Sequence, residues 1–212
     1  MRYRLALVSA LVLLAAPSAA AKAPPNGVRL CGASGACATI GREDAERLSG
    51  LWSSEGLFAS PAAPAPFYTL RYEWPGQPEQ TTYWIPSRSR LRGVYAIGAA
   101  WSRFDGAQLE QFAAGIAPLA APEVTSASVG GKAVQTPKTY LRLLRAGRVV
   151  LATPDVRWIR IRLASTEPSP WTDAAADLRI SARGQWLLRD DFVFKIPRRL
   201  AEQARRGVAL VG

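Results

Sequence analysis

The spacing of apolar residues along the chain predicts a protein built mainly from short antiparallel strands. The clearest pattern covers residues 67–74, where Tyr68, Leu70 and Tyr72 fall on one face and polar residues alternate with them. Alternation with a period of two is typical of a strand that buries one of its faces. After a turn rich in proline and glycine, residues 81–85 are rich in aromatic and β-branched side chains, so they predict a second strand.

Further strands are predicted where short apolar runs lie between turn residues. They cover residues 28–30, 38–40, 94–104, 127–129, 132–134, 148–152, 156–163, 186–189 and 192–196. Gly130 and Gly131 predict a two-residue hairpin turn between two of these strands. Asp190 and Asp191 mark another turn, between the last two strands.

Four short helices are predicted from capping residues and helical spacing. They begin near Arg42, Asp105, Pro137 and Pro197. Asp105 lies three residues before Gln108, which is the spacing of a capping box. Thr136 is expected to cap the helix that follows it. Because hairpins dominate and strands do not alternate regularly with helices, we predict an α+β fold of mostly antiparallel sheet with three to four short helices, in a single compact domain over residues 28–212.

The start of the chain carries the three parts of a secretory signal peptide. Two arginines are followed by a twelve-residue apolar run, and small residues then lead to Ala21. The run is shorter than the ~20 residues with which a helix crosses a bilayer. We therefore expect residues 1–21 to be cleaved near Ala21 and residues 22–27 to form a flexible mature N-terminus. The mature chain, without a transmembrane span, is expected to be secreted and to be extracellular, periplasmic or attached to the cell envelope.

The two cysteines of the chain predict a disulfide bond. Cys31 and Cys37 flank five small residues between two expected strands, and a hairpin brings such positions within bonding distance. Oxidising conditions outside the cytoplasm favour the bond. A redox pair more often has two residues between its cysteines, and a metal site needs more ligands than two thiols. We therefore expect a structural disulfide.

Composition excludes several classes of chemistry. The 212 residues include 27 Lys and Arg, 16 Asp and Glu and no histidine, which gives a formal net charge of +11. Without histidine the chain cannot form a Ser-His-Asp site, a Cys-His site or a histidine-ligated zinc site. The nucleophile motif Gly-x-Ser-x-Gly and the phosphate-binding loop are also absent from the sequence. We expect no metal and no cofactor.

The positive charge is concentrated in the C-terminal part of the chain. Residues 138–212 contain 15 basic and 7 acidic residues, a net charge of +8, whereas residues 22–137 have a net charge of +1. Arginine outnumbers lysine 23 to 4 and alanine occurs 37 times. This bias is also expected of a GC-rich coding sequence, which would scatter arginine over every surface without selecting a ligand.

Two groups of residues are candidates for a binding surface. They are Trp158, Arg160 and Arg162 on the outer face of one expected strand, and Arg88, Arg90 and Arg92 along one side of an extended segment. Arginine beside an aromatic ring suits polyanions. The predicted partner is an anionic polymer of the envelope or the extracellular space. Nucleic acid is not expected, because the protein is exported and carries no reader motif.

A carboxylate-dependent hydrolase acting on envelope glycans is the alternative function. Such an enzyme needs only two well-placed acids, and the candidates are Asp173, Asp177, Asp190 and Asp191. Each has a simpler explanation, since aspartate is a common turn residue and Trp171, beside the first two, suits the edge of a core. We therefore favour a secreted, non-enzymatic binding or structural module.

Overall fold

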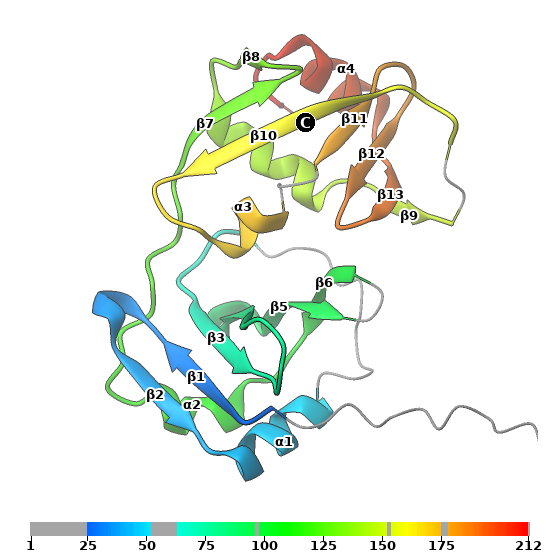
Figure 1. Ribbon diagram of the computed structural model, residues 1–212. Helices are drawn as coiled ribbons and strands as arrows, with labels where there is room; N and C mark the ends of the chain where they lie inside the picture. The colour runs from blue at the N-terminus through cyan, green and yellow to red at the C-terminus, as the bar shows by residue number, and fades with distance from the viewer. Residues whose placement is uncertain (1–24, 52–62, 96–97, 152–153, 175–177, 212) are drawn as a thin grey trace, which may run out of the picture.

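The computed structural model describes residues 25–51, 63–95, 98–151, 154–174 and 178–211, which form two antiparallel sheets (Figure 1). The first sheet has six strands, in the spatial order β2 (Cys37–Ile40), β1 (Gly27–Cys31), β3 (Tyr68–Glu73), β4 (Gln80–Ile85), β5 (Arg90–Tyr95) and β6 (Gly98–Arg103). The second has seven, in the order β8 (Lys132–Ala133), β7 (Val124–Val129), β10 (Trp158–Ser165), β11 (Arg179–Ser181), β12 (Trp186–Arg189), β13 (Phe192–Lys195) and β9 (Arg148–Val150).

Short helices accompany the two sheets. The α-helices are α1 (Arg42–Leu51), α2 (Ala107–Ala113), α3 (Pro170–Ala174) and α4 (Arg198–Arg206). The 3₁₀-helices are η1 (Ala33–Gly35), η2 (Pro86–Arg88) and η3 (Pro137–Arg145). The α+β class with mostly antiparallel sheet is thus confirmed.

One face of the first sheet packs against α1 and α2. Leu30, Leu70 and Leu91 from three of its strands are fully buried on this face. Leu48 of α1 and Leu109 of α2 are buried against them. The apolar face of each strand, read from its alternation, thereby forms a core with two amphipathic helices.

The opposite face of the first sheet shares a core with the second sheet. Tyr83 and Trp101 of the first sheet belong to one buried cluster with Ile161 of the second sheet and Trp171 of α3. Trp171 is only 1% exposed, its ring contacts Phe67 and Trp101, and α3 lies between the two sheets in Figure 1. The expectation that Trp171 packs into the core is confirmed, although it does so from a short helix.

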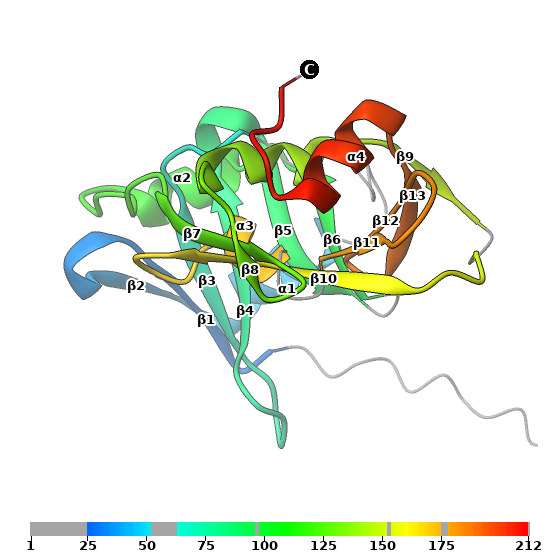
Figure 2. The ribbon, with the colours of Figure 1, turned by 90° about the horizontal axis from the view of Figure 1, so that it is seen from above.

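The helical segments η3 and α4 cover one face of the second sheet. Leu143 of η3 and Ala201 and Ala204 of α4 are fully buried in the same cluster as Ile161 of β10. Seen from above, β10 and α4 lie on opposite sides of this part of the molecule (Figure 2). The residues of β10 that alternate with Ile161 therefore point away from the helices.

The predicted disulfide is confirmed at the end of the first hairpin. Cys31 and Cys37 lie opposite each other in the β1–β2 ladder, with their Cα atoms 4.1 Å apart and their sulfur atoms bonded. The short segment η1 closes the loop between them. The bond thus links two neighbouring strands at the edge of the first sheet.

The expected single strand over residues 94–104 is wrong, because two strands occupy it. β5 ends at Tyr95, β6 begins at Gly98, and the two pair antiparallel with Val94 opposite Ala99. The sequence predicts one extended segment interrupted by Gly98, whereas β6 begins at this glycine.

The starts of two helical segments in the structure also differ from the prediction. α2 begins at Ala107 with Gly106 at its N-cap, so Asp105 lies before the helix and provides no cap. A Cβ atom at Gly106 would lie 2.2 Å from the Trp84 indole, so the packing of that indole requires glycine at this position. The segment after Thr136 is a 3₁₀-helix, and the Thr136 side chain donates and accepts no capping hydrogen bond.

The contacts of the first sheet begin before residue 28, where the first strand was predicted to start. Pro25 is buried, and the Asn26 amide donates to the Glu73 carbonyl at 2.7 Å. The last residues of the segment 22–27, expected to be flexible, are therefore held by the sheet, while residues 1–21 lie outside the described residues. In the described ranges, no helix has the length and apolar character that crossing a membrane requires.

Candidate functional site

The outer face of β10 carries the basic residues that the sequence placed there. Ile161 is fully buried, whereas Arg160 and Arg162 on either side of it are exposed. Trp158 lies two residues before Arg160, on the same face, and is half-buried. The alternation predicted for this strand is confirmed. Within the part of the chain that the structure describes, neither Arg160 nor Arg162 forms an ion pair.

The neighbouring strands extend this face. Arg160 is paired with Arg179 of β11, and Arg162 is paired with Ser128 of β7. Directly opposed residues in antiparallel strands point to the same face with Cβ atoms about 5 Å apart. The Arg160 and Arg179 side chains therefore leave the sheet side by side. Arg160 is exposed at this position, whereas Arg179 is half-buried.

A hollow of about 450 Å³ adjoins the start of β10. Its lining consists of Gly130, Arg157, Trp158, Ile159, Arg160 and Ala182. Gly130 lies in the predicted hairpin turn, which is confirmed by positive φ angles at Gly130 and Gly131. The hollow thus places an indole, aliphatic surface and two arginines around one space, which is typical of sites for ligands with both apolar and anionic parts.

The second predicted group of arginines does not form an exposed stripe. Arg88 belongs to η2 and is exposed, while Arg90 and Arg92 fall on one face of β5. That face is turned toward the second sheet, and Arg92 pairs there with Asp190, their Nη2 and Oδ1 atoms 2.8 Å apart. The side chains are 7% and 8% exposed. Arg92 therefore links the two sheets and is not available to a polymer.

Burial dominates the electrostatics around this ion pair. Burial raises the pKa of Asp190, and the attraction of Arg92 opposes that rise without cancelling it. Burial also lowers the pKa of the neighbouring Arg189 to about 10. Arg189 donates to the carbonyls of Leu143, at 2.6 Å, and Ala146, at 3.0 Å. Both arginines are thus held inside the molecule, where they connect the second sheet to β5 and to η3.

The candidate carboxylates fall into different environments. Asp173 accepts a hydrogen bond from the Tyr83 hydroxyl, and burial together with this bond raises the pKa of Tyr83. Asp191 is exposed in the turn after Asp190, where both residues have positive φ. Asp177 lies outside the described residues. Tyr83 and Arg92 are directly paired in the β4–β5 ladder, so Asp173 and Asp190 contact adjacent positions between the two sheets.

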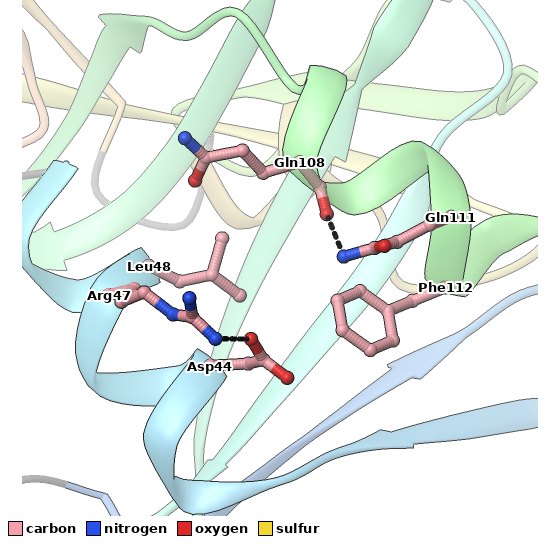
Figure 3. A pocket seen from close by; sticks show the side chains of 6 residues that line it. All are labelled: Asp44, Arg47, Leu48, Gln108, Gln111 and Phe112. Carbon is pink, nitrogen blue, oxygen red and sulfur yellow. Dashed lines mark hydrogen bonds and ion pairs between the residues drawn. The ribbon is translucent and has the colours of Figure 1, made fainter.

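A cleft of about 800 Å³ lies between α1 and α2, on the far side of the first sheet from this interface. Figure 3 shows its lining residues, Asp44, Arg47 and Leu48 of α1 and Gln108, Gln111 and Phe112 of α2. Arg47 donates to Asp44 at 2.5 Å, so the charges of one wall neutralise each other. The other wall offers two amides and one aromatic ring. Sequence patterns did not predict this cleft, because it arises only when two separate helices pack side by side.

No arrangement of described residues points to a metal: they contain no group of three or more His, Cys, Asp or Glu placed to hold an ion. No family model matches the chain, and no match was found among curated proteins or solved structures. The inference of function therefore rests on the surfaces themselves.

Proposed function

We propose that the mature chain is an exported, non-enzymatic binding module that holds an anionic polymer of the cell envelope or extracellular space on the outer face of β10 and β11. The exposed guanidinium groups of Arg160 and Arg162, which form no ion pair within the described residues, carry this proposal. Arg179 of β11 is directly opposite Arg160 and adds a third arginine on the same face. Because planar guanidinium groups bind carboxylate and phosphate in a bidentate manner, an anionic ligand suits this surface.

Export is supported by two separate features. The basic start, the short apolar run and the small residues before Ala21 have the order found in secretory signal peptides. The Cys31–Cys37 disulfide is of the kind that persists in oxidising compartments. An anionic envelope or extracellular polymer would be available to the protein in such a compartment.

The hydrolase alternative finds less support among the described carboxylates. Asp190 is buried in an ion pair with Arg92, and Asp173 accepts a hydrogen bond from Tyr83. Neither lines the hollow at β10 or the cleft between α1 and α2. A glycosidase requires its two carboxylates on either side of the bond that it cleaves, and no pocket described above has that arrangement.

The test is a salt titration of binding to an immobilised polyanion, polygalacturonate, by the wild type and by Arg160→Glu/Arg162→Glu. We expect the double variant to lose at least about tenfold in affinity, equivalent to about 1.4 kcal/mol, and to depend less steeply on salt, because fewer counterions are released. The matched control is Arg199→Glu/Arg206→Glu, which makes the same change in net charge on α4, on the opposite side from β10 (Figure 2).

The control separates a local site from overall charge. If the two double variants lose affinity equally, the polymer responds only to net charge, and the proposed face is wrong. If neither variant differs from the wild type, the arginines of β10 take no part in binding. Circular dichroism and thermal unfolding of each variant establish that the fold is retained.

A further inference from the structure

Two tryptophans lie in one row across the outer face of the second sheet. Trp158 of β10 is paired with Ser181 of β11. The β11–β12 register, which pairs Ile180 with Leu187, places Trp186 of β12 opposite the same serine, and the Trp186 amide donates to the Ser181 hydroxyl at 3.2 Å. Strands are about 4.8 Å apart, so the two tryptophan positions are about 10 Å apart, with a small residue between them.

These two tryptophans differ from the others that the structure describes. Trp84, Trp101 and Trp171 are at most 2% exposed and pack against other rings, and Trp74 stacks on Tyr72. Trp158 and Trp186 are only half-buried, and within the described ranges they have no aromatic contact and their indole N–H groups donate no hydrogen bond. Among the described residues, neither ring thus has an aromatic or hydrogen-bonding partner.

A cation lies next to each of these rings on the same face. Arg160 follows Trp158 by two residues on β10, about 7 Å along the strand. Lys195 of β13 is directly opposite Trp186 and is exposed. The arrangement of ring and cation therefore occurs twice across the sheet. The hollow beside Trp158 adds a recess at one end of this row.

We infer, on the basis of the proposed function, that the polymer is an acidic polysaccharide whose chain crosses β10, β11 and β12 with sugar rings packed on Trp158 and Trp186. A uronic acid polymer repeats the same two elements in every unit, an apolar ring face and a carboxylate. The ring faces pack on the indoles, and the carboxylates reach Arg160 and Lys195. A polyphosphate offers charge without rings, so it uses the cations alone.

Hydrogen bonds hold the turn between β11 and β12, next to this row, in place. Arg205 of α4 donates to the carbonyls of Ser181 and Gly184, at 3.3 and 2.9 Å, and so fastens the β11–β12 turn beside Trp186. The Ala182 amide donates to the Arg157 carbonyl at 2.7 Å, which connects the same turn to the start of β10. The two indoles are therefore carried by linked backbone segments, and a ligand that spans them meets a preorganised surface.

The experiment compares two probes, polygalacturonate and long-chain polyphosphate, on the full mature chain. We expect Trp158→Ala and Trp186→Ala each to lower the affinity for polygalacturonate about tenfold or more and to change the affinity for polyphosphate less than twofold. Trp158→Phe and Trp186→Phe keep an aromatic ring and should retain most of the binding, which gives a second test if an alanine variant folds poorly. Trp74→Ala is the control for removal of an indole elsewhere.

The outcomes separate this inference from the function on which it rests. Loss of both probes on Arg160→Glu/Arg162→Glu, with no effect of either tryptophan variant, would retain the basic face and contradict the polysaccharide. Equal losses for both probes in the tryptophan variants would also contradict it, since the rings would then contribute nothing specific to sugars. Full methyl esterification of the polygalacturonate should abolish binding, and retention of the neutral ester would overturn the role given to the cations.

Discussion

Arg92 and Arg160 have the same side chain and the same predicted role, yet they occupy opposite environments. Each lies on a strand, and each shares a face with another arginine two residues away. Arg92 is buried between the sheets in an ion pair with Asp190, whereas Arg160 is exposed beside Trp158. Local alternation reveals which residues share a face but not whether a second layer covers that face. An arginine therefore becomes a structural or a binding residue according to what packs against its strand.

The largest expected effect follows from this difference in burial. Arg92→Met leaves the Asp190 carboxylate buried without its partner, and we expect a loss of about 3–5 kcal/mol in the free energy of unfolding. Arg160→Met removes an exposed charge and should change it by less than about 0.5 kcal/mol. Urea denaturation of both variants measures the two values. Equal losses in the free energy of unfolding would show that burial does not determine how much the Arg92–Asp190 ion pair contributes to stability.

A double variant sharpens the same comparison. In Arg92→Met/Asp190→Asn neither partner is charged, so the double variant should be more stable than Arg92→Met alone. Asparagine is chosen because Asp190 has φ of 48°, a conformation that asparagine tolerates. Additive losses in the cycle would argue against direct coupling of the two side chains.

Two tryptophans, one buried and one half-buried, allow the same comparison for apolar side chains. Trp171 is 1% exposed in the core that joins the two sheets, and Trp171→Ala should cost about 3 kcal/mol or more, because it leaves a cavity. Trp158→Ala removes a half-exposed indole and should cost less than about 1 kcal/mol while it weakens polymer binding. Thermal unfolding and polymer binding, measured on the same samples, distinguish a tryptophan that stabilises the core from one that binds the polymer. A strongly destabilised Trp158→Ala would place that indole in the core.

Much of the fold was predictable because it depends on local patterns. The alternation around Ile161, the Gly130–Gly131 turn and the Cys31–Cys37 pair each depend on neighbours in one hairpin. The start of α2 was not predictable, because Gly106 is required by an indole from a distant strand. The partner of Asp190 was hidden for the same reason, since Arg92 lies 98 residues earlier.

The candidate site shows the same division. Arg160 and Arg162 were found from the pattern of one strand, and the structure confirms that they are exposed. Trp186 and Lys195 were missed, because only the register across β11, β12 and β13 places them on the face of Trp158. That register is set by pairing between strands, which the sequence of one strand does not reveal.

The disulfide should affect stability and leave binding unchanged. Cys31→Ser/Cys37→Ser removes a short covalent loop in the first sheet, so we expect a loss of about 2 kcal/mol. The proposed binding face lies on the second sheet, so the affinity for polygalacturonate should stay within twofold of the wild type. Calorimetry and binding assays measure these two quantities. A large loss of affinity in a folded variant would show that the two sheets are coupled.

The smallest expected effect is a dependence of stability on pH. Burial raises the pKa of Asp190 above its ordinary value of 3.8, so the native state binds this proton more tightly than the unfolded state does. Stability should therefore fall as pH rises from about 4 through the raised pKa, with a slope of at most about 1.4 kcal/mol per pH unit. Asp190→Asn should lack this component. Identical slopes in urea denaturation of the two proteins between pH 4 and 7 would contradict it.

Nuclear magnetic resonance tests most directly whether the ligand binds to the outer face of the second sheet or in the cleft between α1 and α2. A ¹H–¹⁵N correlation spectrum, recorded during titration with oligogalacturonate, reports on indole N–H and side-chain amide groups at once. The proposed function and the inference drawn from it predict shifts of the Trp158 and Trp186 indole signals, while the Gln108 and Gln111 amide signals of the cleft stay in place. Shifts confined to the cleft, or no shifts at all, would contradict the assignment of binding to the basic face.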